Sequence, residues 1–187
     1  MKASYVLALA TFLCAASAVG AQQRPRPAAQ AASLGPMAPR LQNLVGTWRV
    51  KAELRFAPGA QPRTIDAIAE NRLIGNRWLV SELKGSMEKD GGFHGVGVNG
   101  YDPAQGKYVG YWIDNTRSLL IPVEGVYDAD AHVFRTTSTE RNAQGRSTTV
   151  VSETRILGPD EEVTTFTAHD AKGRPFTRMV LSYHKER

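Results

Sequence analysis

An alternation of apolar and charged side chains between residues 48 and 56 constrains the fold more than any other feature of the sequence. Every even-numbered residue from Trp48 to Phe56 is apolar, and every odd-numbered residue between them is charged. Because successive side chains of a β-strand point to opposite faces, this period of two predicts a strand with one face buried and the other in water.

Nine further runs with strand character follow, and short turns rich in Gly, Pro, Asn and Asp separate them. The predicted strands cover residues 48–56, 64–74, 77–87, 93–101, 107–116, 118–127, 132–140, 146–157, 162–169 and 175–185. Consecutive strands joined by short turns pair as an antiparallel meander, and so wide a sheet closes or curls because open edges invite association. We therefore predict an all-β, up-and-down antiparallel barrel of about ten strands, with a two-sheet sandwich as the alternative.

The N-terminus has the pattern of an export signal. Lys2 precedes an apolar run over residues 5–18 that is too short to span a bilayer, and small residues at Val19 and Ala21 suit cleavage after Ala21. A second cleavage point follows Ala18. Residues 1–21 are therefore predicted to be a signal peptide, and the mature protein to be periplasmic or secreted, with no transmembrane segment.

Cysteine usage narrows the chemistry of the mature chain. Cys14 is the only cysteine, lies inside the predicted signal, and lacks the small residues that precede a lipoprotein cysteine. The mature chain thus has no disulfide, no Cys-ligated metal and no Cys nucleophile. Residues 22–40, rich in Pro, Ala and Gln, are predicted to be a disordered linker, and residues 41–187 to be the barrel domain.

Several sequence blocks resemble known proteins. Gly46-Thr47-Trp48 at the head of the first strand resembles the opening of calycin barrels, which include lipocalins and fatty-acid-binding proteins. The blocks at residues 75–82, 93–102, 107–114 and 125–128 together resemble a bacterial family of unknown function, the one numbered fifteen seventy-nine. The resemblance runs from about Leu44 to Tyr183 and departs from the family at Asn76 and His184. It implies a calycin-like barrel in which Trp48 closes one end against a basic residue near the last strand, and it implies no known activity.

Glycines at 95, 97 and 100 match the spacing of a nucleotide-binding loop. That loop requires a helix directly after it, whereas Tyr101-Asp102-Pro103 forms a turn here. We therefore interpret these glycines as positions where the backbone bends or passes beneath a bulky aromatic side chain.

The predicted ligand-binding residues are the aromatic and charged side chains on strand faces that could line a barrel. They are Trp48, Trp78, Glu82, Trp112, Asp114 and Arg178. Arg178 either holds a carboxylate, as in fatty-acid carriers, or stacks on Trp48 as a structural plug, and the plug is the favoured interpretation. On strand parity, Arg178 shares its face with Phe176, Val180 and His184.

Three functions compete. The first is a binding protein that takes a lipophilic or amphipathic small molecule into the barrel, and the second is a structural or interaction module with a filled barrel. The third is a haem-binding barrel with His184 as the axial ligand, although no resident cofactor is predicted. The four histidines never stand at metal-ligand spacing, which disfavours a metal site, and no catalytic motif is present, which disfavours an enzyme. The net charge of +5 is dispersed along the chain, which disfavours a nucleic-acid partner.

Overall fold

The computed structural model describes residues 38–86, 92–141, 147–169 and 172–186. One short helix precedes ten strands: α1 (Ala38–Leu44), β1 (Gly46–Leu54), β2 (Arg63–Ile74), β3 (Trp78–Gly85), β4 (Phe93–Asp102), β5 (Lys107–Asp114), β6 (Arg117–Asp128), β7 (Val133–Arg141), β8 (Ser147–Ile156), β9 (Glu161–His169) and β10 (Pro175–Lys185). The predicted strand ends agree with these bounds within two residues wherever they fall among the described residues. The predicted signal peptide lies outside those residues, as does most of the predicted linker.

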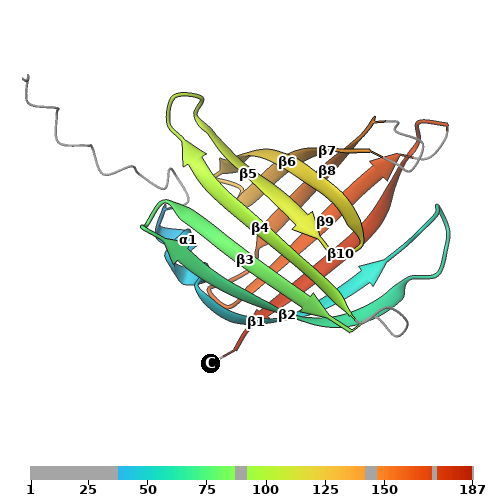
Figure 1. Ribbon diagram of the computed structural model, residues 1–187, viewed down its shortest axis with the longest axis horizontal. Coiled ribbons are helices and arrows are strands. Elements are labelled where there is room, and N and C mark those ends of the chain that lie inside the picture. The colour runs from blue at the N-terminus through green and yellow to red at the C-terminus, as the bar shows by residue number, and fades with distance from the viewer. Residues whose placement is uncertain (1–37, 87–91, 142–146, 170–171, 187) are drawn as a thin grey trace, which may run out of the picture. The chain divides into compact units, whose positions relative to one another are not determined.

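The strands form a closed barrel in which each strand pairs antiparallel with its neighbours in sequence (Figure 1). The barrel closes because β1 pairs with β10, from Trp48 opposite Lys185 to Leu54 opposite Met179. The predicted all-β up-and-down barrel is therefore confirmed, and the sandwich alternative is wrong. Closure leaves no strand edge exposed, which removes the usual route to edge-to-edge aggregation.

Helix α1 begins three residues inside the range predicted to be linker. Pro39 stands in its first turn, where a proline costs no helical hydrogen bond. The helix ends at Leu44, and the following Gly46 adopts a positive φ of 122°. Among the described residues, no helix has the length and apolar character needed to cross a bilayer.

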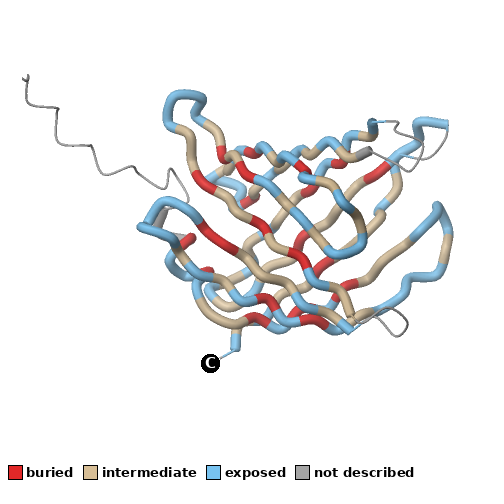
Figure 2. Tube along the Cα trace, in the orientation of Figure 1, coloured by how far each residue is buried: buried red, intermediate tan, exposed pale blue. Residues whose placement is uncertain are grey.

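The helix defines one end of the barrel, which we call the helix end. Leu41 and Leu44 of α1 join the same buried cluster as Trp48, whose side chain is completely inaccessible to solvent. Figure 2 shows that buried residues recur at intervals along the strands of the barrel. The Trp48 Nε1 donates a hydrogen bond of 2.8 Å to the carbonyl oxygen of Leu44. The Lys185 ammonium lies 5.7 Å from the centre of the Trp48 ring, a cation–π contact.

As the resemblance implied, Trp48 closes one end of the barrel against a basic residue of the last strand, but that basic residue is not the one we predicted. Lys185 stacks on Trp48, and the prediction that Arg178 does so is wrong. Arg178 lies near the start of β10, at the opposite end of the barrel, whereas Lys185 is directly opposite Trp48 in the β1–β10 ladder.

The opposite end, which we call the loop end, is where β1, β3, β5, β7 and β9 end and β2, β4, β6, β8 and β10 begin (Figure 1). Tight turns join the strands at the helix end. Gly75 and Asn76 both adopt positive φ, 56° and 51°, at the centre of a β-turn that the Arg77 amide closes by donating to the Ile74 carbonyl oxygen at 3.1 Å. Asn tolerates this conformation better than most residues with a Cβ, which explains why the departure from the family pattern at Asn76 leaves the hairpin intact.

Candidate functional site

The inward-facing residues of the barrel differ in how far their neighbours cover them. Trp48, Val50, Ala69 and Leu79 belong to the buried cluster near the helix end. Farther along the strands Ile121, Val150 and Ala168 are also buried, whereas five other inward-facing residues stay only partly buried: Leu119, Val123, Thr136, Phe166 and Met179. A side chain that points into a closed barrel and keeps accessible surface faces space that its neighbours do not fill, so water can reach part of the interior.

An aromatic pair lines the interior at the loop end. Phe93 and Trp112 stack with ring centres 6.3 Å apart and planes 13° from parallel. Trp112 can lie flat against the wall because Gly95 and Gly97 face it from β4. A Cβ at Gly95 would come within 2.2 Å of the indole, and one at Gly97 within 3.1 Å. The interpretation that these glycines pass beneath a bulky aromatic side chain is confirmed.

The indole connects the aromatic pair to a buried carboxylate. Trp112 Nε1 donates to Asp114 Oδ2 at 3.0 Å, and Arg117 Nε donates to the same oxygen at 3.1 Å. Only 1% of the Asp114 side chain is exposed. Burial opposes its ionisation, but hydrogen bonds from Thr116 and Arg117 outweigh that effect and hold the pKa of Asp114 below its ordinary value.

Arg117 and Arg178 converge on one further carboxylate. Glu140 Oε2 accepts hydrogen bonds from Arg117 Nη1 at 2.8 Å and from Arg178 Nη1 at 3.0 Å. Burial raises the pKa of Glu140, but the charge of Arg178 and the hydrogen bonds from both guanidinium groups prevail and lower it overall. Since β8 and β9 separate β7 from β10 around the wall, the contact between Glu140 and Arg178 spans the inside of the barrel.

These six residues form what we call the loop-end cluster: Phe93, Trp112, Asp114, Arg117, Glu140 and Arg178. The charged members run from Asp114, almost fully buried, to Arg178, with 40% of its side chain exposed. Two guanidinium groups balance two carboxylates, so the cluster is neutral overall. Its most accessible group is a cation that could receive a polar or anionic part of a ligand.

The structure brings three of the predicted site residues together in this cluster: Trp112, Asp114 and Arg178. It places Trp48 inside the barrel at the other end. Trp78 and Glu82 lie on the outer wall, because their strand neighbours Leu79 and Leu83 face inward. Sequence reasoning missed Phe93, Arg117 and Glu140. Asp114 and Arg117 flank a two-residue hairpin turn, a spacing that could have indicated their ion pair.

On β10 the alternation of side chains also predicted the wrong inward-facing residues. The register shifts between Thr177 and Met179, so Arg178 is the extra residue of a β-bulge. Beyond the bulge, Leu181 and Tyr183 face inward, and Val180 and His184 face outward. The predicted shared face of Arg178, Val180 and His184 is therefore wrong, and His184 cannot serve as an axial ligand inside the barrel.

The remaining histidines do not supply an inward ligand either. His94 and His169 stand on the outer face, and His132 lies in the β6–β7 turn at the helix end. Within the described part of the chain, no group of three or more His, Cys, Asp or Glu side chains is arranged to hold a metal ion.

The family profile described as "Protein of unknown function (DUF1579)" matches residues 35–185. The chain belongs to the DUF1579 family. The resemblance drawn from the sequence blocks is confirmed. No curated protein matches the sequence.

Two solved structures share the architecture of this DUF1579 barrel. Rv2717c from M. tuberculosis superimposes with a TM-score of 0.62 at 15% identity, over 82% of this chain and 99% of that one. The S-type phycobiliprotein lyase CPES from Guillardia theta gives a TM-score of 0.54 at 10% identity, over 79% of this chain and 90% of that one. At these identities the likeness establishes a common fold, a barrel of the lipocalin-like type.

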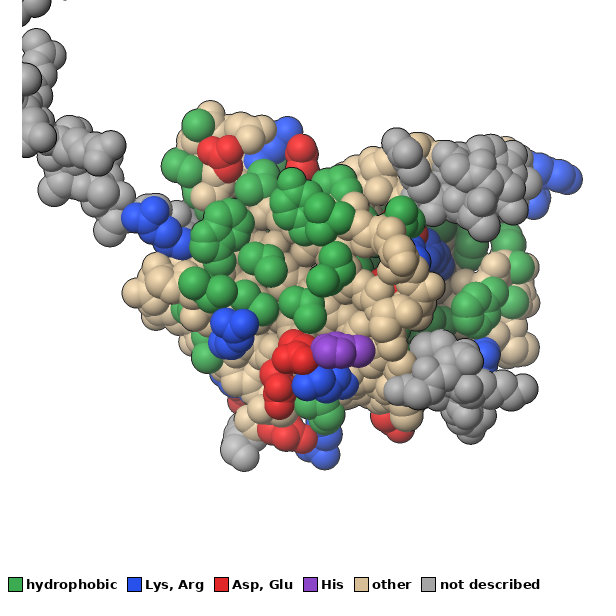
Figure 3. Space-filling view, in the orientation of Figure 1, with side chains coloured by type: hydrophobic (Ala, Val, Ile, Leu, Met, Phe, Trp, Pro, Cys, Tyr) green, Lys and Arg blue, Asp and Glu red, His purple; other side chains and the backbone are tan. Residues whose placement is uncertain are grey.

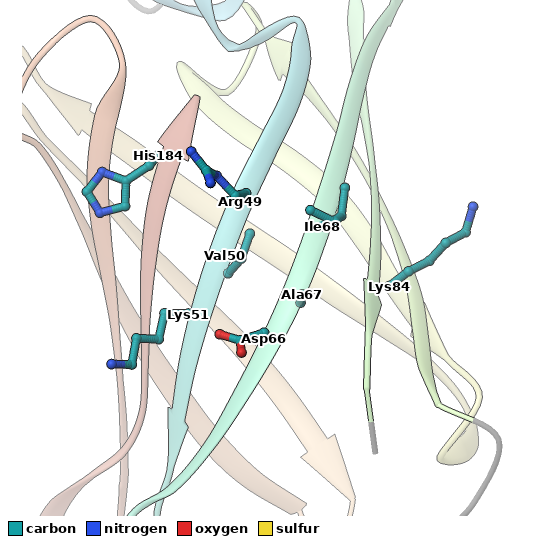
Figure 4. A pocket seen from close by; sticks show the side chains of 8 residues that line it. All are labelled: Arg49, Val50, Lys51, Asp66, Ala67, Ile68, Lys84 and His184. Carbon is teal, nitrogen blue, oxygen red and sulfur yellow. The ribbon is translucent and has the colours of Figure 1, made fainter. Parts of the chain in front are cut away.

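A groove of about 430 Å³ also lies on the outer wall of the DUF1579 barrel, over β1, β2 and the end of β10 (Figure 4). The side chains of Arg49, Lys51, Lys84 and His184 border it, together with Asp66. The Arg49 and Lys84 side chains are 72% and 55% exposed, so its walls are long, solvated cations. Such walls do not preorganise a small-molecule site, which is why the loop-end cluster is the better candidate.

The contact between Gly95 and Trp112 yields a testable prediction. We expect Gly95→Ala to lower the free energy of unfolding by about 1–3 kcal/mol, because the new methyl group must displace the indole from Asp114. Chemical denaturation measures the loss, and near-ultraviolet circular dichroism reports the moved ring. Gly158→Ala is the matched control, since a Cβ there meets nothing within 4 Å. Equal stability of the two variants would contradict the placement of Trp112.

Proposed function

We propose that the protein binds a small amphipathic molecule inside its barrel, with the polar group of the ligand at the loop-end cluster. The observation that carries this proposal is the ion-paired chain from Asp114 to Arg178, which crosses an interior that side chains leave partly accessible. Charged groups inside a barrel are costly unless they are paired or meet a polar ligand. Here they are paired, and Arg178 remains the most accessible of them.

The two sides of the interior favour an amphipathic ligand over a plain hydrocarbon. Aromatic and aliphatic residues line the β3–β6 side, whereas β7, β8 and β9 present hydroxyl groups. Thr136 and Ser152 are hydrogen-bonded at 2.5 Å, and Thr154 and Thr164 at 2.8 Å. A ligand with polar atoms along one edge can exchange hydrogen bonds with this wall, and a simple acyl chain cannot.

The solved barrel of similar fold that is named a phycobiliprotein lyase supports small-molecule binding as a use of this architecture. Fold likeness alone does not transfer a ligand, so the proposal rests on the interior of this chain.

A fluorescent probe tests the site. We expect 1-anilinonaphthalene-8-sulfonate, which is aromatic and anionic, to bind with enhanced emission, and Arg178→Met to weaken its binding about tenfold by removing a charge-assisted hydrogen bond. The neutral analogue N-phenyl-1-naphthylamine should bind both proteins equally. Arg135→Met is the matched control, because that guanidinium lies on the outer face and pairs with Asp128 and Glu153.

Two results would overturn the proposal. One is that neither probe binds the wild-type protein. The other is that Arg178→Met and Arg135→Met weaken the binding of 1-anilinonaphthalene-8-sulfonate equally. Because apolar surface outside the barrel also attracts such dyes, Ile113→Lys on the outer face of β5 should leave the affinity unchanged.

Native mass spectrometry of the protein isolated without denaturation from the organism that encodes it would then identify the natural ligand. The same spectrum tests the proposed export, since cleavage after Ala21 gives a defined loss of mass.

A filled interaction module is the second candidate, and one observation favours it. The outer wall of β3–β6 carries exposed aromatic and aliphatic side chains that the barrel itself does not need.

A further inference from the structure

Apolar side chains cover the outer wall of four consecutive strands. Figure 3 shows them gathered on one face, over β3 to β6. The register of the ladders assigns the patch, which we call the outer apolar patch, to Trp78, Val80, Val96, Val98, Val109, Tyr111, Ile113, Leu120 and Pro122. Trp78, Tyr111, Ile113 and Leu120 are between 41% and 63% exposed, which is unusual for aromatic and large aliphatic residues so close together.

The patch is packed rather than loosely scattered. Val80 points away from the barrel, between Arg72 of β2 and Val98 of β4, yet only 5% of it is accessible. Trp78 lies against Gly100 on the next strand, where a Cβ would come within 2.6 Å of the indole. The Trp78 ring thus rests on the backbone of β4, which limits its conformations before any partner arrives. Such preorganisation lowers the entropic cost of association.

The margin of the patch carries charges of both signs. At one edge Glu82 lies 2.9 Å from Lys84 and 2.8 Å from His94, and at another Lys107 lies 3.2 Å from Glu124. Arg72, opposite Val80 in the β2–β3 ladder, and Arg77, beside Trp78, add two exposed cations. About a two-fold axis, a margin of mixed sign can place the cations of one copy against the carboxylates of the other.

We propose that the outer apolar patch is the contact surface of a homodimer in which two copies pack wall to wall about a two-fold axis. Its accessible apolar area is on the order of 500 Å², within the range of patches that mark interaction sites on monomers. With the charged margin it approaches the roughly 800 Å² per partner of a standard interface. Two sheet faces with interdigitating side chains stack about 10 Å apart, and this face is a curved sheet of the required kind. The proposal is independent of ligand binding inside the barrel.

Sedimentation equilibrium of the full chain between about 5 and 200 µM tests it, since interfaces of this size commonly give micromolar to tighter dissociation constants. We expect the weight-average mass to rise to twice the monomer mass. Ile113→Lys should weaken dimerisation at least tenfold by placing a charge in the patch, and Leu120→Gln should weaken it with less risk to folding. Val151→Lys is the matched control, because Val151 is 41% exposed on the outer face of β8, outside the patch.

Near-ultraviolet circular dichroism of each variant confirms that the environment of buried Trp48 is retained. A wild-type protein that stays monomeric up to about 200 µM would overturn the proposal. So would a dimer that Ile113→Lys and Leu120→Gln leave intact, or one that Val151→Lys disrupts equally. Flotation of monomers with phosphatidylcholine vesicles, abolished by Ile113→Lys, would instead assign the patch to a membrane surface.

Discussion

Trp48→Ala is expected to lower the free energy of unfolding by about 3–5 kcal/mol, the usual cost of removing a large buried aromatic side chain. The indole is fully buried, donates to the Leu44 carbonyl and lies under the Lys185 ammonium. Its removal leaves a cavity beneath α1 and detaches the helix from the barrel. Urea denaturation followed by far-ultraviolet circular dichroism measures the change.

Trp78→Ala is the control for Trp48→Ala, because it removes the same indole from the outer wall, where 41% of the residue is accessible. In dilute protein we expect a loss of less than about 1.5 kcal/mol at that position, in line with partly exposed sites. A comparable loss for both variants would show that Trp48 does not close the helix end. Trp48→Phe should fall between the two, since it keeps the ring but loses the hydrogen bond to Leu44.

Glu140→Ala is expected to destabilise the protein by about 2–4 kcal/mol, because it leaves Arg178 without a carboxylate partner inside the barrel and Arg117 with Asp114 alone. Arg178→Ala should cost less, since the Arg178 side chain is 40% exposed and water can replace its partner. Thermal and urea unfolding at pH 7 measure both. A smaller loss for Glu140→Ala than for Arg178→Ala would contradict the shared role of Glu140.

The same carboxylate makes the stability dependent on acid pH. The pKa of Glu140 is lower in the folded protein than its ordinary value of 4.5, so its contribution is complete above about pH 4.5. The contribution is lost as the pH falls through the lower, folded pKa, because protonation then breaks the pairs with Arg117 and Arg178. Glu140→Gln cannot titrate, so the stability difference between it and the wild type should shrink below pH 4.5. A constant difference would contradict this assignment.

The barrel was predictable from the sequence because short, local sequence patterns determine its strands and turns. The alternation from Trp48 to Phe56 and turns such as Gly75-Asn76 locate the strands within two residues. Closure of the barrel was predicted from the number of strands, and the family was predicted from several sequence blocks that occur in the family's order.

The site was less predictable, since it depends on which face of each strand points inward. On β3 both faces are apolar, with Trp78 and Val80 on one and Leu79 and Leu83 on the other, so alternation alone could not choose the inner face. On β10 the bulge at Arg178 inverts the parity of the residues after it, and nothing in the composition marks that bulge. Glu140 meets Arg178 only because the barrel closes, across 38 residues of sequence.

The pairing of β1 with β10 also dictates the order of events when the chain folds. The first strand of the barrel pairs on one side with the last strand, β10, so the two edges of the sheet stay unpaired until almost the whole domain has been synthesised. Contacts of such long sequence separation slow folding, because the entropy of closing the chain is lost before the contacts form. The barrel therefore cannot close until β10 has been synthesised. A chain truncated before β10 would expose β1 and β9 as unpaired edge strands, which are prone to aggregation.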